Sequence, residues 1–332
     1  GGARRAHILI PTGALMPFSR RLLRPLGVAL LPLALAGCGG SDPAGGSAGE
    51  EPPIGAAPTL LASGDLRFPL DVYIPSGEQN SQLAKAQDRL VDQCMQRYGF
   101  RYESPRAGSA AQPRDESRRY GLSDAAVAAR YGYNNPVLEN RPPKPAPKQL
   151  GPNEKLFLNG EEQVDPAKPV PMSQEESEKS GLGSLTVDGK KVPSGGCMRE
   201  SFLKLYAPVK NSVDVMVPQN FGFDAYGRSR QDTRVEKAIK EWSACMAEKG
   251  YRTDDPVSPE LGFNDATLGS PQAVTAAQQD VACKARTNLV GIWHTVEVAY
   301  QKRLIEQNAE VLTLARKQLE ERMRLAAQLT SA

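Results

Sequence analysis

The residues best suited to chemistry are five cysteines, three of which are followed directly by a methionine. Thiolate and thioether sulfurs are soft ligands that favour Cu(I), so the Cys-Met pairs at 94–95, 197–198 and 245–246 could bind copper. Neighbouring side chains on a helix point about 100° apart, however, so one pair does not easily chelate a single ion. Copper binding is therefore an alternative function, and it requires free thiols.

Histidine chemistry depends on one side chain. The chain has two histidines, His7 and His294, and only His294 lies beyond residue 37. One histidine cannot form a zinc site that uses several imidazoles, and neither an HExxH motif nor a Walker loop is present. We expect His294 to be a packing or surface residue rather than a catalytic base.

Pairs of carboxylates are the third chemical option, because glycosidases use two acids across a cleft. Pairs of adjacent acids in polar segments include those at 161–162, 175–176 and 254–255. Only two tryptophans are present as aromatic platforms for a sugar. We expect these acids to be solvated loop charges, and a carboxylate-dependent envelope hydrolase is kept as the second alternative function.

The N-terminal region has the pattern of an export signal. Residues 20–24 (RRLLR) are basic, and Pro25–Leu35 is an apolar stretch. This stretch is shorter than the roughly 20 residues that span a bilayer, and it is typical of a signal-peptide core. Its end, Leu35-Ala36-Gly37-Cys38, resembles the lipobox of bacterial lipoproteins. The resemblance implies that signal peptidase II cleaves before Cys38, whose fatty acyl chains (palmitate or similar) anchor the protein to the membrane.

Composition divides the chain into four segments. Residues 1–37 are expected to be an over-extended start plus the signal peptide, with the true start at Met16. Residues 38–65 include a Gly/Ala/Pro/Ser-rich stretch and are expected to form a disordered, flexible tether. Residues 66–207 form a first helical module with a long polar insert, and residues 208–332 form a second helical module.

The charge distribution argues against a nucleic-acid partner. The chain has 41 basic and 38 acidic residues, but five arginines and no acid precede Cys38. Beyond residue 37 the balance is 36 basic against 38 acidic groups, which is a slight acidic excess. A nucleic-acid-binding domain is expected to carry a basic excess instead.

Helices dominate the expected elements. Caps and apolar spacing predict helices from Asn80 or Ser81 to Tyr98, from Ser123-Asp124 to Gly132, and from about Gln231 to Gly250. The Asp188-Gly189 dipeptide predicts a small β-hairpin over 184–192, and residues 156–160 are a second candidate turn of this kind.

The last third predicts the longest helix. Ser270-Pro271 is a typical helix start, because proline suits the first helical position. Beyond it an apolar stripe predicts a helix over 284–329, about 70 Å long at 1.5 Å per residue. The distal part of this stripe is formed by Val311, Ala315, Leu319, Met323 and Ala326. We expect it to pack within the chain or against a protein partner.

Two stretches of the chain are related by an internal repeat. Val91–Pro105 (VDQCMQRYGFRYESP) and Trp242–Pro256 (WSACMAEKGYRTDDP) align without a gap at an offset of 151 residues. Cysteine, methionine, glycine, arginine and proline match, and an aromatic residue follows each glycine. A glycine at a helix end lets the chain reverse, so both copies are expected to end an amphipathic helix in the same way.

The repeat also bears on the cysteines that remain if Cys38 is lipidated. An even number of cysteines in an exported chain favours disulfides, and four cysteines allow three pairings. The repeat favours one bridge within each half, Cys94–Cys197 and Cys245–Cys283. Each bridge would stabilise the fold by about 3–5 kcal/mol on the chain-entropy model.

These features together resemble uncharacterised lipoproteins of high-GC actinobacteria. The resemblance spans residues 66–283 beyond the signal. It is carried by the lipobox, a Cys-Met near a helix end with its Gly-aromatic-Arg, the later Gly-Gly-Cys-Met at 195–198, and the stretches Arg119–Leu122 (RYGL) and Ala128–Tyr133 (AARYGY). It implies no known activity and no cofactor.

The sequence therefore predicts a mainly α, disulfide-stabilised lipoprotein on the outer face of a bacterial plasma membrane. We expect a non-enzymatic accessory subunit of a cell-envelope complex, with an envelope protein bound through the long C-terminal helix. A solute-binding protein of an ABC importer is less favoured, because such proteins alternate strands with helices and this chain has no long strand pattern.

Overall fold

The computed structural model describes residues 50–64, 66–105, 116–139, 146, 148–161, 170–180, 185–259 and 261–331. Cys38, the apolar stretch before it and residues 38–49 of the predicted tether lie outside these residues. Within them, no helix is both long enough and apolar enough to cross a membrane.

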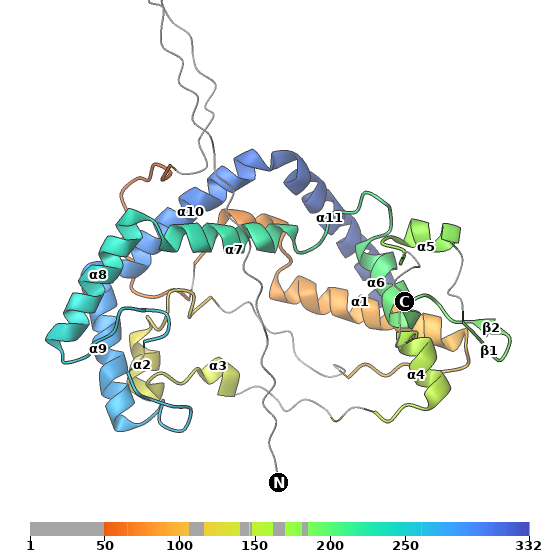
Figure 1. The fold of residues 1–332 in the computed structure, drawn as a ribbon, viewed down its shortest axis with the longest axis horizontal. Helices are drawn as coiled ribbons and strands as arrows, with labels where there is room; N and C mark the ends of the chain where they lie inside the picture. Colours follow the sequence, from red (N-terminus) through yellow and green to blue (C-terminus); the bar gives the residue numbers. More distant parts are fainter. Residues whose placement is uncertain are drawn as a thin grey trace, which may run out of the picture. The chain divides into compact units, whose positions relative to one another are not determined.

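The described chain is mainly α-helical, as the sequence predicts (Figure 1). Its helical elements are η1 (Pro69–Tyr73), α1 (Gly77–Gln96), α2 (Ala125–Tyr131), α3 (Pro136–Glu139), α4 (Pro152–Asn159), α5 (Gln174–Ser180), α6 (Gly196–Tyr206), α7 (Val217–Arg230), α8 (Thr233–Glu248), α9 (Pro271–Thr287), α10 (Leu289–Gln307) and α11 (Ala309–Ser331). The strands β1 (Thr186–Val187) and β2 (Lys190–Lys191) pair antiparallel, with Thr186 opposite Lys191.

Local capping signals place several helix starts where the sequence predicts them. Asp124 caps α2 by accepting a hydrogen bond from the Val127 amide, and Ser270 caps α9 in the same way. The predicted cap of α1 is wrong, because Ser76 and not Asn80 or Ser81 is the N-cap. Gln79 completes a capping box with Ser76, which fixes the helix start at Gly77.

One of the two predicted hairpins is confirmed and the other is wrong. Asp188 and Gly189 both have positive φ, which is the backbone geometry of a type I′ turn between β1 and β2. Residues 156–160 instead form the end of α4, where Gly160 (φ 76°) ends the helix. A glycine with positive φ suits either a tight turn or a helix end, so the dipeptide alone does not distinguish them.

Each half of the repeat contributes to a separate apolar cluster. In the first half, α1, α4, α6 and the hairpin enclose Met95, Phe157 and Val192. In the second half, α7, α8 and α10 enclose Trp242 and Trp293, both fully buried. Each of these two clusters includes one of the disulfides.

Helices from one side of the predicted boundary at residue 207 pack on helices from the other side. Helix α2, from the first half of the sequence, packs on α9, and α11, from the second half, packs on α1 (Figure 1). The segments before α2 and before α9 also approach closely, because a Cβ on Gly121 would lie 1.9 Å from the carbonyl oxygen of Pro256. Residues 50–332 accordingly form one compact unit.

The predicted C-terminal helix is divided into separate helices. The long C-terminal helix is confirmed as α11, but the single helix over 284–329 is wrong, since the chain breaks at Asn288 and Asn308. Asn288 adopts the left-handed conformation (φ 50°, ψ 34°), which asparagine tolerates better than most residues. The apolar spacing continues across both breaks, so periodicity alone did not reveal them.

The asparagine at the first break also holds a segment that the sequence assigns to the tether. The Asn288 side chain accepts a hydrogen bond from the Leu60 amide and donates one to the Pro58 carbonyl. Ile54 and Leu60 pack against the cluster around Trp293. The packed unit therefore begins at Glu50 rather than at residue 66.

Candidate functional site

Both disulfides that the repeat favours are present. Cys94 pairs with Cys197 and Cys245 pairs with Cys283, with Cα–Cα distances of 5.6 and 5.7 Å. All four cysteines are buried. Because the sulfurs are bonded to each other, they are not thiolates that could bind copper in this oxidised form. Among the described residues there is no cluster of histidine, cysteine and acidic side chains that could hold a metal ion.

The two copies of the repeat end their helices with the same hydrogen bonds. In the first copy the Phe100 amide donates to the Met95 carbonyl, and in the second the Tyr251 amide donates to the Met246 carbonyl, at 3.1 and 3.0 Å. The intervening glycines have φ of 87° and 88°. This is a Schellman motif, in which a left-handed glycine lets the chain turn back on the last helical turn.

A second interaction of the repeat is conserved in position but reversed in polarity. In the first copy the Asp92 carboxylate accepts a hydrogen bond from the Tyr102 amide at 3.0 Å. At the same offset of 151 residues, the Ser243 hydroxyl donates to the Thr253 carbonyl at 2.5 Å. Both bonds connect the end of the helix to the extended segment that follows it.

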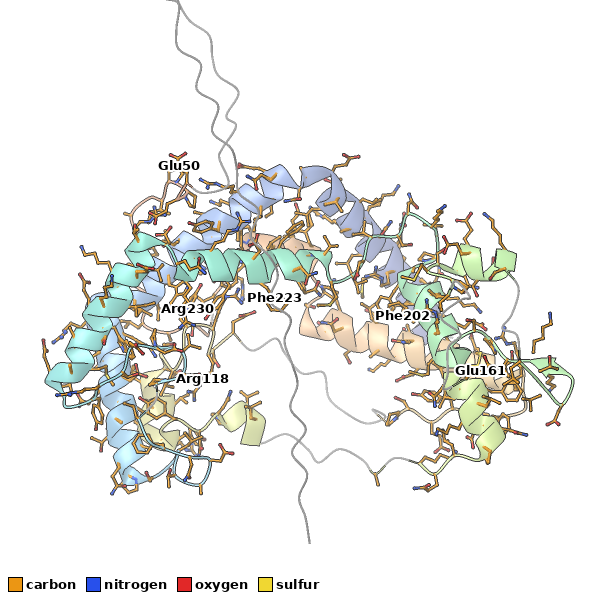
Figure 2. The ribbon with its side chains drawn as sticks, in the orientation of Figure 1. Glu50, Arg118, Glu161, Phe202, Phe223 and Arg230 are labelled. Carbon is orange, nitrogen blue, oxygen red and sulfur yellow. A yellow bond between two sulfur atoms is a disulfide. The ribbon has the colours of Figure 1, made fainter. Side chains whose placement is uncertain are left out.

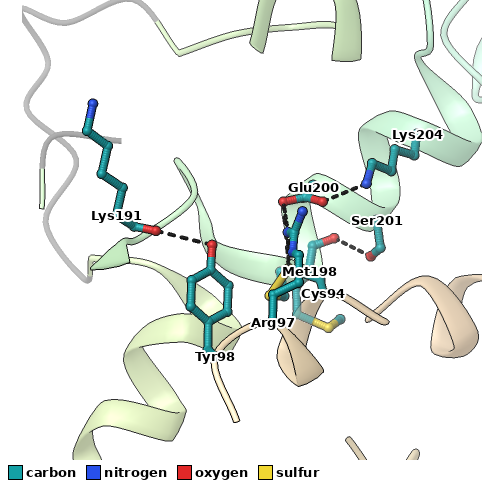
Figure 3. The surroundings of a disulfide bond; sticks show 9 residues. Cys94, Arg97, Tyr98, Lys191, Met198, Glu200, Ser201 and Lys204 are labelled. Carbon is teal, nitrogen blue, oxygen red and sulfur yellow. Dashed lines mark hydrogen bonds and ion pairs between the residues drawn. A yellow bond between two sulfur atoms is a disulfide. The ribbon is translucent and has the colours of Figure 1, made fainter. Parts of the chain in front are cut away.

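An ion pair beside each disulfide is also reversed between the copies. Arg97 lies three residues after Cys94 and contacts Glu200, three residues after Cys197, at 2.5 Å (Figure 3). In the second module the corresponding pair has the opposite charges. Glu248 and Arg286, each three residues after a bridged cysteine, lie 2.9 Å apart. The correspondence between the two halves therefore extends to the surroundings of Cys197 and Cys283, which lie outside the two aligned stretches.

The ion pairs of Glu200 predict how the free energy of unfolding depends on pH. Burial by itself raises the pKa of Glu200, but hydrogen bonds from Lys204 and Arg97 outweigh it, so the pKa is below its usual value of 4.5. A lowered pKa means that ionised Glu200 stabilises the fold at neutral pH and that this contribution is lost as pH falls below about 4. We expect Glu200→Gln to reduce the free energy of unfolding by about 1–2 kcal/mol at pH 7 and by much less at pH 3.

Urea unfolding of the two proteins at both pH values measures this difference. Glu175→Gln is the matched control, because Glu175 pairs with Lys179 at the surface and should leave the unfolding midpoint unchanged. A deficit of Glu200→Gln that is the same at pH 3 and pH 7 would contradict the ion-pair contribution.

Glu297, a fully buried acid of the second module, belongs to a hydrogen-bond network that connects several elements. Glu297 is fully buried and accepts hydrogen bonds from Arg119, from the Tyr120 hydroxyl at 2.8 Å and from the Gln301 amide at 3.0 Å. Burial and the neighbouring charge of Glu297 raise the pKa of Tyr120. Gln301 in turn accepts from the Leu70 amide. Within the described part of the chain, these hydrogen bonds connect η1, α10 and the segment before α2.

A second buried pair joins α9 to two loops. Asp280 accepts from Lys284 and from the Trp242 indole at 2.9 Å. The Lys284 ammonium also donates to the carbonyl oxygens of Leu122 and Pro256, at 2.8 and 2.7 Å. Both charged side chains are at most 1% exposed, so this pair is also structural.

Among the described residues, the side chains that the sequence offers for catalysis lie on separate elements. Glu161 is exposed beyond α4, Glu175 pairs with Lys179 on α5, and Asp255 lies 3.3 Å from Arg230 at the end of α7 (Figure 2). Glu162 lies outside the described residues. The His294 ring lies 3.0 Å from the Arg67 carbonyl oxygen and packs edge-on against Phe68. This is the packing role that we expect for a single histidine.

A pocket between the modules contains functional candidates that the sequence does not indicate. It has a volume of about 260 Å³ and is formed by η1, α1, α6, α7, α11 and the loop before α7. Arg322 of α11 and Gln219 of α7 line it, and neither belongs to a recognisable motif. One signal was present: Arg322 follows Ala315 and Leu319 at helical spacing, which places an arginine on the buried stripe.

Comparisons of the chain with protein-family models, curated proteins and solved structures give no match.

Proposed function

We propose that this protein is a membrane-anchored, extracytoplasmic lipoprotein that acts as a non-enzymatic accessory subunit of a cell-envelope complex. The observation that best supports the proposal is the pair of disulfides, Cys94–Cys197 and Cys245–Cys283. Disulfides persist in oxidising compartments outside the cytoplasm, which is where a protein with a lipobox is delivered. Two or more acyl chains on Cys38 would hold it firmly at the membrane surface.

A non-enzymatic role is supported by how the buried acids are used. Glu297, Asp280 and Asp232 are each at most 1% exposed, and each pairs with a base of the chain: Arg119, Lys284 and Arg234. A general acid or base must reach the substrate, whereas these carboxylates contact only the chain's own groups among the residues described. Their engagement favours a scaffold over a hydrolase.

The outward face of α11 is the surface that we propose for the envelope partner. The inward stripe of α11 packs against α1 and α6, so the apolar positions are occupied within the chain. The outward face is charged and exposed, and it includes Arg316, Lys317, Glu320, Glu321 and Arg324. A partner that binds here would present a surface with charges of both signs. The ion pairs would determine its orientation more than they would increase its affinity.

The anchor and the partner can be tested separately in the bacterium that encodes the protein. Cys38→Ser should move the protein from the membrane fraction to the soluble extracytoplasmic fraction, and intact mass should show a diacylated Cys38 only in the parent. A photo-crosslinking residue at Lys317 on α11 should capture a reproducible envelope protein, whereas one at Lys237 on α8, which is 78% exposed, should not. An unacylated Cys38 would contradict the anchor, and equal capture from both positions would contradict the partner surface.

A further inference from the structure

The pocket between the modules is built by elements from both halves of the repeat. Leu83 comes from α1, Phe202 and Tyr206 from α6, Gln219 from α7 and Arg322 from α11. The exposed Phe202 side chain, which is labelled in Figure 2, projects from α6 at this pocket. The pocket therefore forms only when α11 has packed against α1 and α6.

Arg322 is a buried cation without an acidic partner. It is 8% exposed, its Nε donates to the Leu205 carbonyl at 3.2 Å, and its guanidinium lies 4.9 Å from the centre of the Tyr206 ring. No carboxylate among the described residues forms an ion pair with it. Lys284, which is also buried, differs because it contacts the Asp280 carboxylate, and the partly buried Arg119 contacts Glu297. An unpaired buried charge is unfavourable, so this arginine is poised to receive an anion.

Two acceptors in the same pocket complement the arginine. The Gln219 Oε1 atom is buried and has no hydrogen-bond donor among the described residues. Asp214, which also lines the pocket, accepts a hydrogen bond from the Met216 amide and forms no ion pair in the described part of the chain. Gln318 differs from both, because its Oε1 accepts from the Val213 amide. The pocket thus offers a cation and a carboxylate beside apolar side chains, and the Gln219 amide becomes a ligand contact when its side chain turns toward the pocket.

We infer that this pocket binds a free amino acid. The Nη groups of Arg322 suit a carboxylate bound by two parallel hydrogen bonds, and Gln219 with Asp214 suits an ammonium group. Leu83, Leu319 and Phe202 suit a short apolar side chain. At about 30 Å³ of liquid volume per water, a volume of 260 Å³ corresponds to roughly nine non-hydrogen atoms, the size of leucine. This inference is independent of the lipid anchor and of the partner surface on α11.

Isothermal titration calorimetry of the purified full chain tests the inference with L-alanine, L-leucine and L-phenylalanine. We expect L-leucine to bind at one site. L-Leucinamide lacks the carboxylate and 4-methylpentanoate lacks the ammonium group, so each should bind about 10- to 100-fold more weakly, as expected for lost hydrogen bonds to charged groups. If none of the three amino acids gives a binding signal, the inference is overturned. If inorganic phosphate binds more tightly than the amino acids, the ligand is a phosphate rather than an amino acid.

Variants of the pocket identify the binding groups. Arg322→Met should abolish L-leucine binding, and Arg322→Lys, which keeps the charge but loses the planar fork, should weaken it about tenfold or more. Gln219→Leu should weaken L-leucine binding and leave 4-methylpentanoate unchanged. Arg324→Met is the matched control, because Arg324 is an exposed arginine on the same helix. Far-UV circular dichroism and intact non-reduced mass verify the fold of each variant. Unchanged L-leucine binding by folded Arg322→Lys and Arg322→Met would overturn the inference.

Discussion

Replacing Lys284 with methionine is expected to lower the free energy of unfolding by about 3–5 kcal/mol at pH 7. Asp280 would remain fully buried without its counter-charge, although the Trp242 indole still donates to it. The Leu122 and Pro256 carbonyl oxygens would lose the Lys284 ammonium as their donor. Urea unfolding followed by tryptophan fluorescence measures the loss.

The same variant should show a distinct dependence on pH. Burial raises the pKa of Asp280, and Lys284 opposes this shift, so removing Lys284 raises the pKa further. An acid whose pKa is higher in the folded state favours folding as pH falls, because protonation removes the buried charge. The deficit of Lys284→Met should therefore shrink between pH 7 and pH 4.

Two further variants separate the buried pair from general effects of the substitution. Lys237→Met removes a lysine whose side chain is 78% exposed and should change the unfolding free energy by less than about 1 kcal/mol. Asp280→Asn combined with Lys284→Met should be more stable than Lys284→Met alone, because no unpaired charge remains. The losses in unfolding free energy of Asp280→Asn and of Lys284→Met are measured separately and added. If the double variant loses as much free energy as this sum, the direct coupling of Asp280 and Lys284 is refuted.

Removal of either disulfide is expected to have an effect of similar size. The bridges join residues separated by 103 and 38 positions. On the chain-entropy model, replacing Cys94 and Cys197 with alanine should reduce the free energy of unfolding by about 5 kcal/mol, and replacing Cys245 and Cys283 by about 4 kcal/mol. Thermal and urea unfolding of the two double variants measure these losses.

Each double variant has an internal control. Adding a reductant to the parent should reproduce the combined loss, whereas a variant that lacks all four cysteines should not respond to reductant. The two bridges lie in different apolar clusters, so their losses are expected to add unless the modules unfold together. A loss below about 1 kcal/mol in either double variant would show that the bridge does not limit the unfolded chain.

Features with local causes could be predicted from the sequence. Asp124 and Ser270 start helices because their side chains satisfy free amides in the first turn. Gly99 and Gly250 end helices because they adopt positive φ without strain. The cysteine pairing followed from the repeat, and the two helix ends of the repeat have the same backbone hydrogen bonds. The lipobox prediction remains a prediction, since Cys38 lies outside the described residues.

Several elements could not be predicted because packing rather than local preference produces them. Helix α7 contains Gly222 and Gly227, which weaken an isolated helix, yet it packs on α10. The break at Asn288 leaves the apolar spacing intact and depends on contacts with Pro58 and Leu60, more than 200 residues away in the chain. Such contacts have no signature in a short window of sequence.

The sequence by itself determined the helical class, the hairpin at Asp188-Gly189 and the repeated helix ends, because these depend on neighbouring residues. The tertiary structure decided that Arg322 shares the buried side of α11. Arg322 is 8% exposed between Leu319 and Ala326, and Met323 packs, partly buried, on the same cluster of α1 and α6 residues. Hydrophobicity predicts burial of Met323 but not of Arg322, because the direction in which α11 crosses its neighbours is set by the whole packed unit. The packing of α11 therefore places a buried arginine in the pocket between the modules.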